Sequence, residues 1–157
     1  MSIVKQAYYK ALKAHEGQKR RNGLDYFENH VEKVYEAVIY DRFWLFPKPS
    51  HNYWLVDKEI FHCVLAASLL HDVLEDTKET VTEFPQLVQD LVGILTRNKN
   101  ESYFDYIMKI NDCGSITVAA RGIKIADLTC NIQDLKEGSM KDKYRLAKYI
   151  LSQGLHI

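Results

Sequence analysis

The sequence predicts an all-α domain of about six or seven helices. Every element that can be predicted is helical, because apolar residues recur at three- and four-residue spacings along most of the chain. The length of 157 residues, with 46% hydrophobic and 27% charged residues, suits one globular domain with its own core. Only three prolines and scattered glycines interrupt the pattern, so we expect no interdomain linker.

The apolar faces place the helices in order. The first carries Val4, Ala7 and Ala11 and ends before Gly17. A long one near the C-terminus has so many apolar positions that we expect it to be buried on most sides. The helices are expected at residues 3–15, from 28 or 29 to about 39, from 57 to about 70, 84–96, from 101 to about 110, 115–136 and 139–152.

Residues 41–57 form an aromatic-rich insertion between the second and third helices. The segment holds two tryptophans, two phenylalanines and a tyrosine, and it has no clean helical or strand period. Pro47 and Pro49 oppose regular structure there. Three interpretations stay open: a loop whose aromatic side chains fold back on the core, a surface for a partner, and a lid that stacks on a ligand base.

Charge and cysteine content narrow the class of protein. Lys+Arg and Asp+Glu both number 21, which argues against a dedicated nucleic-acid-binding protein but allows a small anionic substrate in a local basic pocket. The three cysteines have no CxxC spacing, so we expect reduced thiols in a cytoplasmic protein. No signal peptide, membrane span or membrane partner is expected. The oligomeric state cannot be predicted.

The stretch from Leu65 to Thr77 is the most informative part of the chain. It begins as an apolar helix and ends in the adjacent pair His71 and Asp72, followed by Glu75 and Asp76. Burying adjacent ionisable side chains is costly unless they are paired or bind a metal. Neighbours on a regular helix point about 100° apart, so both could reach one ion only at a helix end or kink. The alternative is a surface loop whose acids face water.

Three further places have two interpretations each. Lys19, Arg20 and Arg21 are either solvated cations or a phosphate clamp. His30 is either a capping or packing residue or a metal ligand. Lys124, Asp127 and Asn131 share one face of the long helix. Either Lys124 and Asp127 form an ion pair that satisfies both, or Asp127 binds a metal and Asn131, one turn on, binds a ligand.

An ordered set of motifs resembles a known family. It consists of AHEGQKRRNG, a histidine in YFENH, then LLHDVLEDT, ILTR and IKIADLTCNIQDL. This set resembles the hydrolase domain of the RelA/SpoT alarmone family and the small alarmone hydrolases, within the HD phosphohydrolase superfamily, over roughly residues 5–136. The resemblance implies a single HD hydrolase domain over residues 1–157, with no room for a synthetase or regulatory domain.

The resemblance also implies a role for each candidate residue. It makes Glu75 and Asp76 the acids that orient and deprotonate the attacking water. Arg20, with Arg21 as the alternative in register, and Lys124 would hold phosphates, and Asn131 would contact the nucleotide sugar. The implied metal is most often manganese, although the mixed nitrogen and oxygen set also suits iron or zinc; its ligands would be His30, His71, Asp72 and Asp127.

The implied activity is metal-dependent removal of the 3′-pyrophosphate from ppGpp, giving GDP and pyrophosphate in the stringent response. Two departures from the family pattern keep other nucleotides open as substrates (NADPH, an adenosine alarmone or a deoxynucleotide): Leu128 and Cys130 replace a basic residue and a histidine. Val31 also replaces the proline that usually follows the first histidine. A non-catalytic alarmone-binding module, with residues 41–57 as its docking surface, is the alternative from another class.

Overall fold

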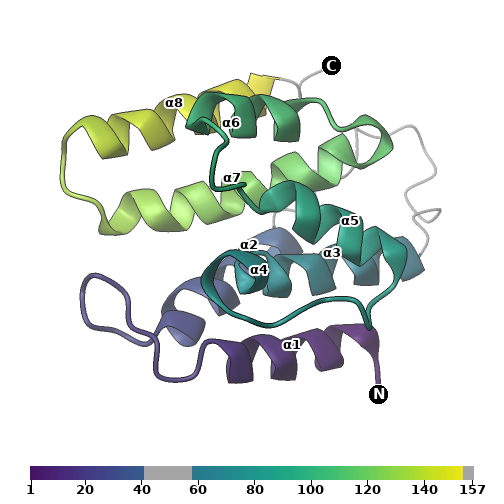
Figure 1. The fold of residues 1–157 in the computed structure, drawn as a ribbon. Helices are drawn as coiled ribbons and strands as arrows, with labels where there is room; N and C mark the ends of the chain where they lie inside the picture. Colours follow the sequence, from purple (N-terminus) through teal and green to yellow (C-terminus); the bar gives the residue numbers. More distant parts are fainter. Residues whose placement is uncertain (41–57, 154–157) are drawn as a thin grey trace.

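The computed structural model describes residues 1–40 and 58–153, and these residues form a bundle of α-helices without a β-strand (Figure 1). The predicted all-α class is therefore confirmed. Two short turns, η1 (Phe27–Val31) and η4 (Gly114–Ile116), and the one-turn helix α4 (Val73–Asp76) accompany the longer elements. The seven longer helices in this part of the chain are α1 (Ile3–Ala14), α2 (Glu32–Tyr40), α3 (Lys58–Leu70), α5 (Gln86–Leu95), α6 (Tyr103–Asn111), α7 (Thr117–Asp134) and α8 (Ser139–Gln153).

Two buried helices organise the bundle. Helix α3 packs against α1, α2 and α5, and α7 packs against α2, α5, α6 and α8. Figure 1 shows α1 and α8 on opposite sides of the bundle, with α3 and α7 between them. An interior helix should be apolar all round rather than amphipathic, and α3 fits this rule because every residue from Cys63 to Leu70 is buried.

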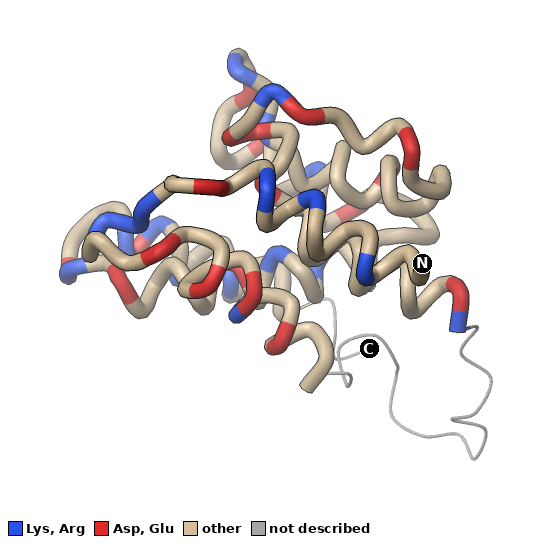
Figure 2. Tube along the Cα trace, turned by 90° about the horizontal axis from the view of Figure 1, so that it is seen from below, with Lys and Arg blue, Asp and Glu red and all other residues tan. Residues whose placement is uncertain are grey.

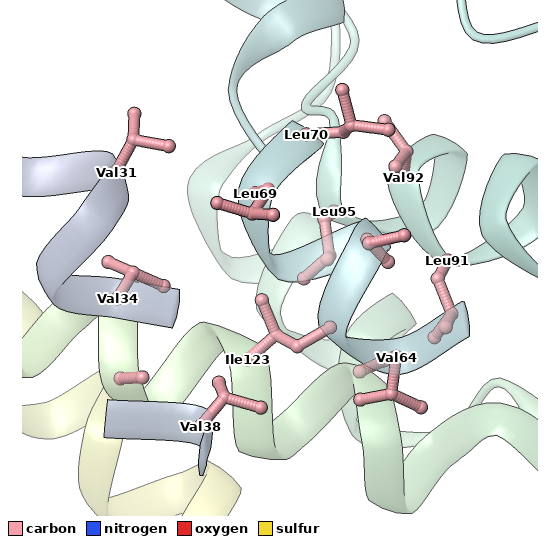
Figure 3. Close-up of a cluster of buried hydrophobic side chains, with 14 of the residues drawn as sticks. Val31, Val34, Val38, Val64, Leu69, Leu70, Leu91, Val92, Leu95 and Ile123 are labelled. Atoms are coloured by element: carbon pink, nitrogen blue, oxygen red, sulfur yellow. The ribbon is translucent and has the colours of Figure 1, made fainter. Parts of the chain in front are cut away.

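The core lies where α2, α3, α5 and α7 meet. Figure 3 shows Val34, Leu69 and Ile123 pointing into the same space from three of these helices. Fully burying one such side chain contributes about 2 kcal/mol to folding. The only polar side chain in the buried run of α3 is Ser68, whose hydroxyl donates to the Leu65 carbonyl at 2.8 Å and so leaves no unsatisfied group.

Helix starts differ from the prediction by up to two residues, and local hydrogen bonds explain the shifts. Helix α5 begins at Gln86 because Pro85 precedes it with an extended ψ of 152°. Helix α6 begins at Tyr103, not at Glu101, because the hydroxyl of Ser102 accepts from the backbone N–H of Asp105 at 3.0 Å.

The segment before α2 is helical earlier than predicted. The π-helical turn η1 runs directly into α2, so the chain coils continuously from Phe27 to Tyr40. Such turns insert an extra residue per turn, change which side chains face the core, and occur often at functional sites. His30 lies in this turn and is buried.

The predicted break after the apolar helix is present. Helix α3 ends at Leu70, His71 and Asp72 form a tight turn, and α4 begins at Val73. This turn lets two adjacent side chains face the same point.

The insertion at residues 41–57 lies outside the described residues, so its three interpretations stay predictions. Among the described helices, none is long and apolar enough to cross a membrane.

Candidate active site

The structure brings the four predicted metal ligands together from three elements. His30 comes from η1, His71 and Asp72 from the turn after α3, and Asp127 from the middle of α7. One ligand atom from each lies within 4.8 Å of all the others. His30, His71 and Asp127 are at most 3% exposed. The four side chains therefore form a compact cluster in the protein interior.

Hydrogen bonds at the far side of each ring orient the two histidines. His71 Nδ1 donates to the Ser68 carbonyl at 2.8 Å, and His30 Nδ1 contacts Cys130 Sγ at 3.4 Å. With Nδ1 occupied, each ring turns Nε2 inward, and the two Nε2 atoms lie 3.3 Å apart. Inward Nε2 atoms with an outer hydrogen bond are the arrangement typical of metal-binding histidines.

The carboxylates complete an electron-rich centre. Asp72 Oδ2 lies 3.0 Å from His30 Nε2 and 2.9 Å from His71 Nε2. Burial alone lowers the pKa of each imidazole, but the nearby carboxylates outweigh it and raise the pKa of His30 well above its ordinary value and that of His71 less strongly. In turn the imidazoles hold the pKa of Asp72 well below its ordinary value despite its burial. A centre that attracts positive charge in this way fits a divalent cation of the Mn, Fe or Zn type.

Asp127 forms the predicted ion pair with Lys124 and also lies in the cluster. Its Oδ2 accepts from Lys124 Nζ at 2.6 Å, while its Oδ1 lies 3.3 Å from His30 Nε2. Asn131 Nδ2, one turn on, donates to the same Oδ1 at 2.6 Å. Although burial alone raises the pKa of Asp127, Lys124 and His30 lower it far below its ordinary value. The Lys124–Asp127 ion pair and the place of Asp127 in the cluster therefore coexist.

The two candidate catalytic acids lie on α4 at the edge of the cluster. Partial burial and the nearby Asp72 raise the pKa of both Glu75 and Asp76. Tyr26 links the two sets of acids, because its hydroxyl lies 2.7 Å from Asp72 Oδ2 and 3.2 Å from Asp76 Oδ2. Glu75 accepts from the backbone N–H of Arg97 at 3.2 Å. Both residues line the same cavity as Asp72 and Asp127.

Arg20 faces the site, and Arg21 lies beside it. Arg20 Nε donates to Asp134 Oδ2 at 2.6 Å and its Nη2 donates to Asn131 Oδ1 at 3.3 Å. Its side chain is only 6% exposed, which is unusual for an arginine. Gly23, in the turn that follows Arg20 and Arg21, has a φ of 81°, a value that side-chain-bearing residues rarely adopt. The Arg21 guanidinium instead contacts Met140 on α8.

A cavity of about 370 Å³ connects these groups. Six basic and five acidic residues line it. Four of the acids belong to the cluster or to α4, and Asp134 pairs with Arg20, while the cations come mainly from the loop before η1, from Arg97 and from α8. Figure 2 shows basic and acidic residues interspersed along the rest of the trace. The cavity is lined by Lys19, Arg20, Arg21, Tyr26, Asp72, Glu75, Asp76, Arg97, Tyr103, Tyr106, Lys124, Asp127, Asn131, Asp134, Lys143 and Tyr144.

Sequence reasoning missed several residues of the cavity wall. Tyr26 precedes His30 by four residues, so helical spacing could have indicated that the two share a face. Arg97 is the arginine of the ILTR motif, but the resemblance gave it no role. Lys143 and Tyr144 lie on α8, and the sequence pattern did not indicate that this part of α8 reaches the cavity. Their position depends on how α8 packs against α6 and α7.

The two departures from the family pattern on α7 do not alter the described cavity. Leu128 is 1% exposed and packs in the core. Cys130 is 9% exposed and lines a different groove between α2, α7 and α8. Neither side chain lines the cavity beside the cluster.

The chain is similar to parts of longer curated proteins. No protein-family model matches the chain. The chain is 30% identical over 154 residues to the bifunctional (p)ppGpp synthase/hydrolase SpoT of Escherichia coli K12, which covers 90% of this chain and 19% of that protein. It is 27% identical over 156 residues to the GTP pyrophosphokinase rsh of Brucella melitensis, which covers 92% of this chain and 18% of that protein. The chain thus spans about a fifth of the length of these curated relatives.

A solved structure shares the fold. The structure described as a metazoan ortholog of SpoT that hydrolyses ppGpp superposes with a TM-score of 0.67 at 21% sequence identity, covering 99% of this chain and 86% of that chain. At this identity the match shows a shared helical fold. More particularly, the comparisons confirm the resemblance to the alarmone hydrolase domain of the RelA/SpoT family.

Proposed function

We propose that this chain is a metal-dependent hydrolase that converts ppGpp to GDP and pyrophosphate, acting as a single hydrolase domain. The observation that carries the proposal is the cluster of four converging ligand atoms, two of which belong to Asp72 and Asp127 in the lining of a cavity that six basic residues also line. A relative in Escherichia coli O157:H7, 30% identical over 154 residues, is named guanosine-3′,5′-bis(diphosphate) 3′-pyrophosphohydrolase. The arrangement suits a substrate with several phosphates.

His30, His71, Asp72 and Asp127 would hold the ion, which we propose to be Mn²⁺. Two imidazoles and two carboxylates form a donor set that suits this metal and leaves room for further oxygen ligands. A divalent ion in such a site neutralises phosphate charge and lowers the pKa of bound water towards about 7. Asn131 and Lys124 keep Asp127 oriented, because each donates to one of its two oxygens.

Glu75 and Asp76 act as general bases in this proposal. A water oxygen bonds to the phosphorus that carries the ribose 3′-oxygen, and the bond from that phosphorus to the 3′-oxygen breaks, so the 3′-oxygen leaves with GDP and the attacked phosphorus becomes part of pyrophosphate. One carboxylate accepts a proton from the water, and the 3′-oxygen takes up a proton. The raised pKa of both acids suits this role, because a base works best when its pKa lies nearer the working pH.

Arg20 and Lys124 bind phosphate oxygens from the inner part of the cavity, and Arg21 does so from its rim. Arg20 is held by Asp134 and Asn131, so its guanidinium is oriented before a ligand arrives. Asn131 lies between Arg20 and Asp127 and would contact the sugar.

A cytoplasmic location is part of the proposal, because three cysteines without CxxC spacing are typical of a reducing compartment.

The test is product analysis with the purified chain, ppGpp and Mn²⁺. We expect GDP and pyrophosphate in equal amounts by ion-exchange chromatography, and neither product from the Asp72→Ala variant. A parallel panel of NADPH, an adenosine alarmone and a deoxynucleotide tests the other substrates. If the chain hydrolyses one of these nucleotides and leaves ppGpp intact, the proposal that ppGpp is the substrate is wrong. If it binds ppGpp without hydrolysing it, the proposal that the chain is an enzyme is wrong.

A further inference from the structure

We propose that Cys130 is a positioning residue for His30: its sulfur accepts the Nδ1 proton of His30 and so keeps the Nε2 lone pair directed at the metal position. This inference rests on the proposed metal centre. The starting observation is the 3.4 Å contact between His30 Nδ1 and Cys130 Sγ, which joins a turn near the N-terminus to α7.

A second contact fixes the direction of this hydrogen bond. Cys130 Sγ lies 3.7 Å from the backbone carbonyl of Asn29, and a carbonyl oxygen can only accept. The thiol proton therefore points to Asn29, and the sulfur lone pairs are free to accept from His30. The result is a short relay, in which Nδ1–H of His30 donates to sulfur and the thiol donates to the carbonyl.

The two histidines of the cluster differ in what holds them. The Nδ1–H of His71 donates to the Ser68 carbonyl at 2.8 Å, a backbone group that no substitution removes. His30 depends on a side chain instead. Outer hydrogen bonds of this kind orient metal-binding histidines, and their loss costs about 10- to 100-fold in metal affinity. The orientation of His30 can thus be tested by changing one sulfur atom.

Cys130 acts through His30 and has no direct access to substrate. It follows Asp127 by three residues on α7, yet it lines the groove between α2, α7 and α8 and is 9% exposed. The described cavity that holds the candidate catalytic and phosphate-binding groups does not include it. Substitution here should alter metal affinity while leaving the cavity wall intact.

The experiment measures Mn²⁺ binding to the whole chain without substrate, by the loss of the electron paramagnetic resonance signal of free Mn²⁺. Cys130→Ala should weaken binding about tenfold or more, and Cys130→Ser, which restores an acceptor, should stay within about threefold of the unmodified chain. The matched control is Cys63→Ala, because Cys63 is also 9% exposed but lies on α3, eight residues before His71. It should bind Mn²⁺ unchanged.

A cobalt spectrum separates positioning from direct ligation. With Co²⁺ bound, a sulfur ligand gives a thiolate-to-metal charge-transfer band, and we expect none from the unmodified chain. Equal affinity for Cys130→Ala and the unmodified chain would overturn the proposal, as would such a band. Absence of Mn²⁺ binding by the unmodified chain would instead remove the metal centre itself, and with it the proposed function. Circular dichroism shows that each variant is folded before binding is compared.

Discussion

The inner wall of the cavity, where Asp72 and Asp127 of the cluster line it, differs from the outer wall in how firmly the side chains are held. Asp127 and the two cluster histidines, which do not line the cavity themselves, are buried, and each is fixed by a hydrogen bond outside the cluster. At the outer wall, Lys19, Arg97 and Lys143 are exposed. Fixed geometry suits chemistry at one point, because a misplacement of about 1 Å can cost about 100-fold in rate. Exposed cations suit the binding of an anion that carries phosphates at several positions.

The largest expected effect is at the inner wall. Asp72→Ala removes the oxygen that lies within 3.0 Å of both histidines, so Mn²⁺ binding should be lost and ppGpp turnover should fall by about 10³-fold or more. Single-turnover rates and metal analysis of the same preparation measure both effects. The helical circular dichroism should persist, because Asp72 lies in a turn outside the apolar core. If the variant keeps its turnover, the inner wall is not the site of the chemical step.

The pH dependence of Mn²⁺ affinity sharpens the description of the inner wall. The carboxylates raise the pKa of His30 and His71 above the ordinary value of 6.5, so protons compete with the ion through neutral pH. Affinity should therefore rise with pH, by about tenfold per pH unit for each proton displaced, until the pH passes the raised pKa values. Binding titrations between pH 6 and 9 measure the slope. A flat profile would show that neither imidazole is a ligand.

The outer wall should change affinity for substrate more than the chemical step. Lys143→Ala should raise KM for ppGpp about tenfold and leave kcat nearly unchanged, because an exposed cation at the rim contributes mainly to binding. Lys148→Ala is the matched control, since Lys148 is on the same helix but lines the groove on the other side of α7. If the two variants behave alike, the rim does not bind the substrate.

The smallest effect concerns the loop that carries Arg97. Glu101 accepts from the backbone N–H of Asn98 and from Lys109 Nζ, both at 3.1 Å, and these bonds lower its pKa although burial alone raises it. A lowered folded-state pKa stabilises the fold above the unfolded pKa, and this contribution is lost as the pH falls. Glu101→Gln should cost about 1 kcal/mol at pH 7.

Urea unfolding of Glu101→Gln and the unmodified chain at pH 7 and at pH 3 measures the pH-dependent part of the difference. The two curves should lie further apart at pH 7 than at pH 3. A difference that grows as the pH falls would contradict the sign of the pKa shift.

The sequence predicted the fold well because apolar periodicity depends on local spacing. The burial of α3 and the break at His71 follow from residues that are adjacent in the chain. The four cluster residues were identified by residue type and by resemblance, and the structure brings them together. Their role as metal ligands stays a proposal.

The parts that sequence reasoning missed depend on contacts between distant elements. Tyr26 bridges Asp72 and Asp76 only because η1 packs against α3, and Lys143 reaches the cavity only because α8 packs against α6. Neighbouring residues in the sequence also could not show whether Asp127 forms an ion pair or lies in the cluster. A carboxylate has two oxygens, and the fold uses each for a different partner.

The most direct test of the central claim is one titration that follows bound Mn²⁺ and ppGpp turnover in the same metal-free preparation. We predict one tightly bound ion per chain, with pyrophosphate release that rises in step with occupancy and stops when the ion is removed by a chelator. Pyrophosphate release from the metal-free chain, or full occupancy without any release, would contradict the account.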